Sequence, residues 1–342
     1  MKISKNIINH FSFKRILIAP LDWGLGHATR CIPIIKELQQ RQIEVTIAAD
    51  GAIATLLQRE FPEIKIICLK GYNISYGKWK NLFLLKIISQ LPKMWKVIQY
   101  ERNWLNDMIA LHKIEAVISD NRFGFCSKKV PSFFITHQLQ IKSGSFFLDK
   151  IIRKINYYFI NQFDECWIPD IESADNYAGT LSHPTVFPKI PVKYIGMLSR
   201  FKKSAQEKKY KIAIVLSGPE PQRTIFEKKI IAQLDDIKVP AVLVLGLPNE
   251  IQELSLTNQQ VTLHNYLDAA ALSNLMQQSE IVIARSGYST IMDLVSIGQR
   301  AVLVPTPGQT EQEYLAKYLS EKGLFKTMKQ SDFELKNVIK EL

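Results

Sequence analysis

The feature that most constrains the fold of this chain is an alternation of short apolar runs with segments of helical periodicity. Strands separated by helix-length segments are typical of right-handed β-α-β units, which build parallel sheets. Helical periodicity is clearest in Cys31–Gln40 and Ala52–Arg59. In the first half of the chain the predicted strands are Arg15–Pro20, Glu44–Ala49, Lys65–Leu69, Ala116–Ser119 and Ser132–Thr136.

The alternation stops in a polar segment near residues 199–210 and then starts again. The later predicted strands are Ile212–Leu216, Ala241–Gly246, Val261–His264, Ile281–Ala284 and Ala301–Pro305. Gly298 and Gly323 stand where glycine commonly ends a helix. We therefore predict an α/β protein with two doubly wound, Rossmann-like domains, residues 1–198 and 211–342, joined by a linker at 199–210. Ligands of such sheets bind beyond the carboxyl ends of the strands.

Composition narrows the functional classes. The net charge of +12 indicates a nucleic acid, an anionic membrane or a phosphorylated ligand as partner, although basic proteins without a polyanion partner are common. No motif or Lys/Arg-dense helix supports nucleic acid. Four scattered cysteines without a C-x-x-C pair favour a reducing compartment over a zinc or disulfide scaffold. With no export signal or membrane-length apolar run, we expect a cytoplasmic protein, with peripheral attachment to a membrane left open.

A glycine-rich loop follows the first predicted strand, at residues 22–30. Gly24 and Gly26 allow a ligand to approach the backbone, and His27 titrates near neutrality. A dinucleotide site is an alternative, because Asp50 ends the next strand, but the third glycine of that fingerprint is Thr29 here. A plain strand-to-helix turn is the other alternative.

Three loops in the second half carry groups suited to a nucleotide sugar. Small hydroxyl residues at a helix N-terminus bind phosphate, carboxylates bind ribose hydroxyls, and amides bind sugar hydroxyls. Each loop also has a structural interpretation, as helix caps and first-turn acids. The candidate residues are Ser217, Gly218 and Arg223 in the first loop, Arg285, Ser286, Gly287, Ser289, Thr290 and Asp293 in the second, and Gln309, Gln312 and Glu313 in the third.

Together these loops resemble glycosyltransferase family 28, whose members have the GT-B fold with two domains facing a central cleft. Residues 285–293 match the family's donor loop, in which an acid at the position of Asp293 holds the ribose. Glu313 departs from a pair of glutamines in the family, which leaves the donor sugar open. Tyr266 and Leu267 lie in a segment, 265–267, that resembles the one whose backbone reads uracil. The glycine-rich loop ending in His27 and the strand ending in His137 also match the family.

The resemblance implies an inverting glycosyltransferase that moves a sugar from a nucleoside-diphosphate donor, a UDP-sugar above all, to a hydroxyl acceptor in cell-envelope glycan synthesis. The candidate bases are His27, Asp120 and His137, in falling order of preference for the first two. Because no Asp-x-Asp pair is present, we expect helix N-termini and Arg285 or Arg223 to stabilise the leaving group, with no metal and no cofactor. A hydrolase that releases free sugar from a UDP-sugar is the nearest alternative, since related enzymes share the first loop. A non-catalytic nucleotide-sugar-binding protein is a further alternative.

The segment 78–100 has five lysines, no acid and several aromatic residues. Its apolar side chains share one helical face and its lysines another, as in a helix lying on an anionic membrane, and as in an amphipathic helix packed on a core. Pro92 is expected to split the segment into two helices. A membrane contact here would fit a lipid-linked acceptor.

Overall fold

The computed structural model describes residues 12–71, 83–247 and 258–340, and in 83–92 the backbone alone. The chain divides into two compact units, 1–198 and 199–342. Each unit contains one parallel sheet, so the predicted α/β class is confirmed. Residues 199–209 contain no helix or strand, and Ser204 and Lys208 hydrogen-bond to Gln277 and Ser279 of the second unit.

The first unit has a seven-stranded sheet in the order β3-β2-β1-β4-β5-β6-β7. Its strands are β1 (Arg15–Pro20), β2 (Glu44–Ala49), β3 (Ile66–Cys68), β4 (Ala116–Asp120), β5 (Ser132–Ile135), β6 (Glu165–Ile168) and β7 (Val192–Tyr194). Its helices are α2 (Leu25–Gln40), α3 (Gly51–Glu60), α4 (Phe83–His112), α5 (Phe146–Ile160) and the short 3₁₀ turn η2 (Gly179–Leu181).

The second unit has a six-stranded sheet in the order β10-β9-β8-β11-β12-β13. Its strands are β8 (Tyr210–Val215), β9 (Ala241–Val244), β10 (Val261–His264), β11 (Ser279–Ala284), β12 (Ala301–Leu303) and β13 (Lys326–Thr327). Its helices are α6 (Gln222–Ile231), α7 (Ala269–Gln277), α8 (Tyr288–Ile297), α9 (Thr310–Glu321) and α10 (Leu335–Lys340).

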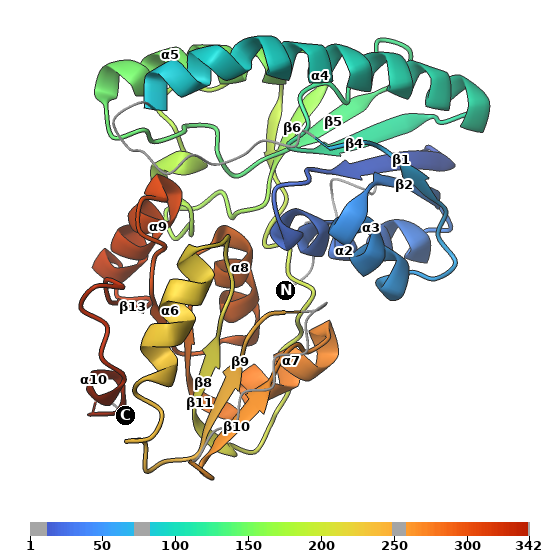
Figure 1. The fold of residues 1–342 in the computed structure, drawn as a ribbon. Helices are drawn as coiled ribbons and strands as arrows, with labels where there is room; N and C mark the ends of the chain where they lie inside the picture. The colour runs from blue at the N-terminus through green and yellow to red at the C-terminus, as the bar shows by residue number, and fades with distance from the viewer. Residues whose placement is uncertain (1–11, 72–82, 248–257, 341–342) are drawn as a thin grey trace. The chain divides into compact units, whose positions relative to one another are not determined.

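Side chains that alternate along the strands bind helices to both faces of the first sheet. Leu17 of β1 and Val117 of β4 pack against Leu105 of α4, and Phe134 of β5 packs against Ile160 of α5. The register pairs Leu17 with Val117, so α4 and α5 cover the same face (Figure 1). Neighbouring residues of β1 point to the opposite face, where α2 and α3 lie.

In the second unit, α6 and α10 share one apolar cluster with the sheet. Phe226 of α6 and Phe333 meet edge to face, with ring centroids 5.2 Å apart, over Ile214 and Ile283. Gly298 ends α8 with φ +67°, a left-handed conformation that favours glycine, as the sequence predicted. The predicted strands all exist, with ends that differ by two residues or fewer, while β6, β7 and β13 were not predicted.

The expectation that Pro92 divides the basic segment is wrong, because α4 runs without a break from Phe83 to His112. Proline removes one backbone hydrogen bond, and the helix-forming residues on both sides continue the run. Residues 78–82 of the predicted membrane-contact segment lie outside the described residues. Within the segments that the structure describes, none of the helices combines the length and the apolar character needed to span a bilayer.

Candidate active site

The glycine-rich loop joins β1 to α2 at the carboxyl edge of the first sheet. Gly24 occupies the N-cap of α2 with φ +98°, a left-handed value that favours glycine. No side chain caps this helix end, and its first turn contains no acid. His27 lies in that turn, next to the last residue of β4, Asp120, because β1 and β4 are neighbours in the sheet.

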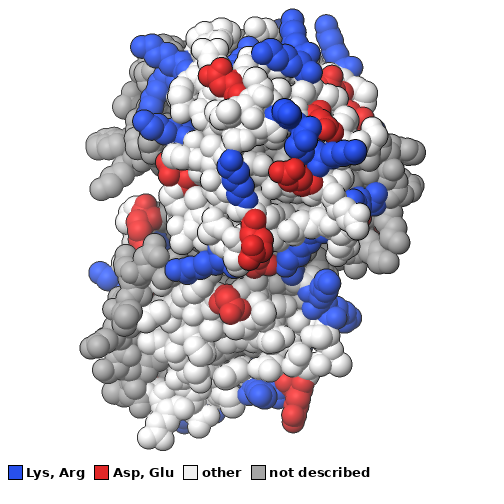
Figure 2. Space-filling model, turned by 90° about the vertical axis from the view of Figure 1, so that its right-hand side faces the viewer, with Lys and Arg blue, Asp and Glu red and all other residues white. Residues whose placement is uncertain are grey.

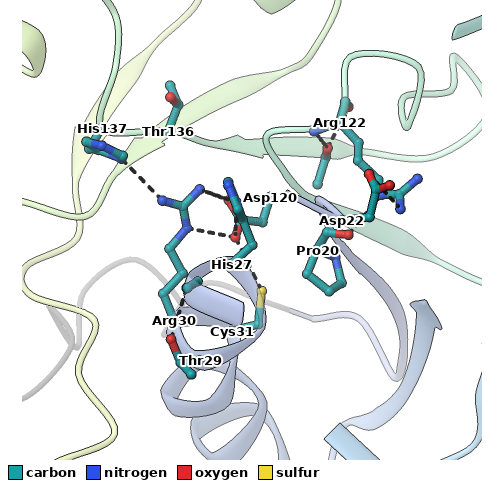
Figure 3. Close-up of polar contacts among 12 residues, drawn as sticks. Pro20, Asp22, His27, Thr29, Arg30, Cys31, Asp120, Arg122, Thr136 and His137 are labelled. Carbon is teal, nitrogen blue, oxygen red and sulfur yellow. Dashed lines mark hydrogen bonds and ion pairs between the residues drawn. The ribbon is translucent and has the colours of Figure 1, made fainter. Parts of the chain in front are cut away.

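A buried arginine organises the polar groups at this edge (Figure 3). Arg30 Nε donates to Asp120 Oδ2 at 2.7 Å, and its Nη2 donates to Oδ1 of the same carboxylate. The guanidinium also reaches two imidazoles, with Nη2 2.8 Å from His27 Nδ1 and Nη1 3.2 Å from His137 Nδ1. Arg30 is 4% exposed and Asp120 is fully buried. All three candidate bases therefore meet around one cation that the sequence analysis did not single out.

These contacts set the charges of the group. Burial by itself would raise the pKa of Asp120, but the charges of Arg30 and His27 and their hydrogen bonds outweigh it and lower the pKa to about 2. Burial, followed by the charge of Arg30, lowers the pKa of His27, against the opposing effect of Asp120. Asp120 is thus ionised with both oxygens engaged, and His27 is neutral near pH 7.

A second buried ion pair fixes the neighbouring loop. Arg122 Nε donates to the Pro20 carbonyl at 2.8 Å, and Arg122 Nη1 donates to Glu101 Oε1 at 2.7 Å. Glu101 is fully buried on α4, and its other oxygen accepts from the Gly124 amide at 3.1 Å. This pair ties α4 to the ends of β1 and β4, and so supports the loop that carries His27.

In the second unit, the loop after β11 leads into the N-terminus of α8. Gly287 is the N-cap, and no side chain caps the helix. Ser286 Oγ donates to the Gln312 carbonyl at 2.8 Å, which joins this loop to α9. Ser289 and Thr290, in the first turn, are half-buried. The exposed amides of a helix N-terminus favour an anion.

The loop after β12 is held by the side chains predicted to contact a sugar. Gln312 Oε1 accepts from the Thr306 amide at 2.9 Å, and Gln312 Nε2 donates to Gln309 Oε1 at 2.6 Å. Glu313 accepts from the Gly308 amide at 2.9 Å. Gln309, Gln312 and Glu313 therefore shape this loop in the structure, whatever ligand they also bind.

The two candidate arginines of this unit are engaged within the protein. Arg285 lies over the Phe226 ring and donates to the carbonyls of Val304, Pro305 and Gln222. Burial lowers its pKa to about 10. Arg223 pairs with Glu220 and with the buried Glu227, both at 2.6 Å. In the structure, these two arginines hold loops together at the carboxyl edge of the sheet.

Asp293 lies one turn into α8, where its Oδ1 accepts a hydrogen bond from Ser199 Oγ at 2.5 Å. Burial raises its pKa to about 6, against the lowering effects of Ser199 and Arg200. Oδ2 has no hydrogen-bond partner among the described residues. A ribose at this carboxylate would have to share or replace Ser199.

The remaining predicted residues lie on neighbouring loops. Ser217 and Gly218 are exposed after β8, and a Cβ added at Gly218 would lie 3.7 Å from Thr306 Oγ1. Tyr266 and Leu267 follow β10 and are half-buried, next to Asp268, which caps α7. Gly24 and Gly26, predicted to bind the donor, lie in the first unit with His27. In residues 12–71, 83–247 and 258–340, no three His, Cys, Asp or Glu side chains are grouped to hold a metal ion.

Comparisons with known proteins decide the family. The model of the glycosyltransferase family 28 C-terminal domain matches residues 243–342, which include α8, α9 and the loops before them. An uncharacterised glycosyltransferase of Methanosarcina acetivorans is 24% identical over 90% of this chain and 84% of its own length. The chain is a GT-B glycosyltransferase whose C-terminal domain belongs to family 28.

Further relatives agree with this assignment. The UDP-N-acetylglucosamine--N-acetylmuramyl-(pentapeptide) pyrophosphoryl-undecaprenol N-acetylglucosamine transferase of Pasteurella multocida is 27% identical to this glycosyltransferase, over 95% of the chain and 87% of the relative. Among solved structures, the glycosyltransferase of kitacinnamycin aligns with a TM-score of 0.65 at 15% identity, covering 96% and 90% of the two chains. The MurG of Acinetobacter baumannii aligns with a TM-score of 0.56 at 14% identity, covering 96% and 89%. At these identities the solved structures establish the fold alone.

Proposed function

We propose that this glycosyltransferase transfers a sugar, with inversion and without a metal ion, from a UDP-sugar to a hydroxyl group of a cell-envelope acceptor. The observation that carries the proposal is the presence of two features, one in each unit. An uncapped helix N-terminus, that of α8, stands beside an amide-bearing loop within the family 28 domain. A neutral histidine stands at the carboxyl edge of the other sheet.

The donor would bind through the second unit. The amides at the start of α8, with the hydroxyls of Ser289 and Thr290, suit the pyrophosphate. Asp293 has an oxygen to offer the ribose, and the backbone at Tyr266 and Leu267 would read the base. Relatives named for UDP-N-acetylglucosamine support uridine. Glu313 and the loop 305–310 would contact the sugar, whose identity is open because a carboxylate stands where the family has an amide.

The proton of the acceptor hydroxyl would pass to His27. The acceptor oxygen bonds to the anomeric carbon, the bond from that carbon to the phosphate oxygen breaks, and its electron pair leaves with the nucleoside diphosphate. Asp120 is a poor base, because its pKa is about 2 and both of its oxygens accept from Arg30. The departing charge would be stabilised by helix amides, and the arginines 223 and 285 would act through the loops that they hold.

A lipid-linked acceptor is supported by an apolar surface on the first unit. Phe146 and Phe147 at the start of α5 are 77% and 70% exposed. A groove of about 460 Å³ between α4 and α5 is lined by Trp95, Tyr158, Lys154 and their neighbours. Lys93 and Lys96 of the predicted contact segment are exposed beside Trp95. Apolar side chains flanked by lysines suit the inner face of the cytoplasmic membrane, as a peripheral contact.

The test incubates purified protein with a panel of UDP-, GDP- and TDP-sugars, with and without a polyprenyl-diphosphate sugar acceptor, in the presence of EDTA. We expect acceptor-dependent release of UDP and a product of inverted configuration. Stoichiometric free sugar without acceptor would instead establish the hydrolase alternative. Loss of turnover in EDTA, restored by a divalent cation, would contradict metal independence. Binding without turnover, unaffected by His27→Ala, would indicate a non-catalytic binding protein.

A further inference from the structure

Arg30 contacts every titratable group that surrounds His27. Its five N–H groups can donate but never accept, and the guanidinium does not lose its proton in proteins. The groups that face His27 are Arg30, on the same helix, Asp120 at the end of β4, and His137 after β5. The Cys31 thiol lies behind them, 3.8 Å from Asp120 Oδ2. The geometry of this set determines which ring nitrogen of His27 carries the proton.

The contact at 2.8 Å between Arg30 Nη2 and His27 Nδ1 requires a lone pair on Nδ1. A proton on Nδ1 would point at an N–H group of Arg30. Asp120 Oδ2 is the alternative partner of the same nitrogen, at the longer distance of 3.2 Å. The neutral ring therefore carries its proton on Nε2, which has no hydrogen-bond partner among the described residues.

A base needs the opposite arrangement. To take a proton from a hydroxyl, Nε2 must present a lone pair, so the ring proton must be on Nδ1, where Asp120 would accept it. The change requires no net proton: Nε2 gives one to water and Nδ1 takes one up. It does require Nη2 of Arg30 to leave Nδ1. Arg30 can do so and keep Asp120, because its Nε remains bonded to Oδ2.

We propose that Arg30 is a positioning residue for His27, which holds the ring in the Nε2–H form in the free enzyme and releases it to Asp120 when His27 acts as the base. The part of this inference that concerns His27 as a base rests on the proposed function. The part that concerns the position of the ring proton does not. Two consequences follow. Arg30 adds to the effect of burial in keeping a histidine beside a buried carboxylate neutral, and it makes the ring a hydrogen-bond donor toward whatever first enters the site.

The test uses ¹⁵N-histidine NMR of the full-length protein without ligand, which reports the protonated nitrogen of each ring. The chain has six histidines, and a His27→Gln sample identifies the signal of His27. We expect an unprotonated Nδ1 in the wild type and a protonated Nδ1 in Arg30→Gln. Titration of Arg30→Gln should show His27 holding its proton to higher pH, because Asp120 is then unopposed. In the double variant Arg30→Gln/Asp120→Asn the titration should return toward the wild type.

Activity provides the second measurement. In Arg30→Gln the acid limb of kcat/KM should move to higher pH, so that a loss of about tenfold or more at pH 6.5 largely disappears at pH 9. Arg41→Gln is the matched control, since Arg41 directly follows the same helix and pairs with Glu37, outside this group. An equal loss of kcat/KM at every pH would assign Arg30 a structural role and overturn the proposal.

Two other results would also overturn it: a protonated Nδ1 in the wild type, or an unchanged ring in Arg30→Gln. If Arg30→Gln does not fold, because Asp120 is left buried without its partner, the wild-type spectrum and the double variant decide. The NMR measurement needs no substrate. Absence of transferase activity would therefore remove the proposed function and leave the position of the ring proton measurable, whereas a protonated Nδ1 would remove the role of Arg30 and leave transfer intact.

Discussion

Asp120 ends a strand and Asp293 lies one turn into a helix, and the pKa values of these two carboxylates move in opposite directions. Arg30 donates to both oxygens of Asp120 and, together with His27, outweighs burial and lowers the pKa of Asp120 to about 2. Asp293 has a hydroxyl partner, Ser199, and Arg200 at longer range, so burial prevails and the pKa rises to about 6. The charged form of Asp120 is stabilised by its surroundings. The charged form of Asp293 is destabilised by burial, and a ligand that hydrogen-bonds to it would offset that destabilisation.

Asp293→Asn tests this cost. A carboxylate whose folded pKa is about 6 and whose unfolded pKa is 3.8 lowers stability as pH rises from about 4 to about 6. The variant should therefore be more stable than the wild type at pH 8, by about 1–3 kcal/mol since the side chain is partly exposed. The two proteins should converge near pH 4. Urea unfolding at both pH values measures the difference, and a variant less stable at pH 8 would show that Ser199 and Arg200 outweigh the effect of burial.

The same carboxylate gives the donor site a pH dependence. Protonation of Asp293 below about pH 6 removes the charged acceptor offered to the ribose. UDP affinity, measured by calorimetry, should fall below that pH in the wild type and should be weaker and flat in Asp293→Asn. If the UDP affinity of the wild type does not change between pH 5 and pH 8, the ribose does not bind Asp293.

At the scale of elements, the candidate sites are helix N-termini without side-chain caps. The N-caps of α2 and α8 are glycines, Gly24 and Gly287, whereas α3 and α7 are capped by the side chains of Asp50 and Asp268. A capping carboxylate satisfies the first amides of a helix and complements its dipole. The first amides of α2 and α8 therefore have no capping side chain, a property that they share with α5, α6 and α9.

Ser289→Asp places a carboxylate in the first turn of α8, where we propose that the pyrophosphate binds. The acid should leave stability unchanged or raise it by about 0.3–1 kcal/mol, since it complements the helix dipole. It should also weaken UDP binding at least tenfold by charge repulsion. Thermal unfolding with and without UDP measures both effects. Ala52→Asp, in the exposed first turn of α3, is the control for the dipole alone. If the two variants bind UDP equally well, the pyrophosphate does not bind at the start of α8.

Most of the architecture could be predicted because its strands are buried on both faces and so read as continuous apolar runs. Two of the unpredicted strands are short: β13 is Lys326–Thr327, exposed and polar at a sheet edge, and β7 is half-buried. The third, β6, is buried and has four residues, the same length as the predicted β9. At the site, glycines and histidines stood out by type. Arg30 did not, although its position three residues after His27 on a helix puts the two on one face. Its partner Asp120 is distant in sequence, and only the sheet order brings them together.

The basic charge is a property of the whole molecule. On the face shown in Figure 2, lysines and arginines are interspersed with acids, which does not resemble a continuous track for nucleic acid. The apolar surface of α5 carries positive charge, because Lys150 lies over the Phe146 ring at 4.3 Å and Lys154 lines the neighbouring groove. Membrane attachment generally requires both an apolar and an electrostatic contribution.

Phe146→Ser/Phe147→Ser should reduce binding to vesicles of phosphatidylglycerol and phosphatidylcholine at least tenfold, since each phenylalanine contributes about 1.5–3 kcal/mol when buried. Wild-type binding should weaken as salt is raised, because screening reduces the attraction of the lysines. Sedimentation with vesicles measures both. Ile225→Ser/Leu324→Ser removes two exposed apolar side chains from the other unit and is the control. Equal binding by the two double variants, or binding to neutral vesicles alone, would reject this surface as the contact.

The pairing of β1 with β4 matters for a chain that is still being synthesised. Leu17 pairs with Val117 on the adjacent strand, and α2, β2, α3, β3 and α4 are all made in between. Until β4 leaves the ribosome, β1 is an open edge, and Arg30 faces neither of the carboxylate oxygens that later hold it. Translation of the first hundred residues thus yields three of the seven strands, with the cation of Arg30 and without its counterion Asp120. Chaperone demand and aggregation should therefore be high in that interval and should fall once Asp120 emerges and pairs with Arg30.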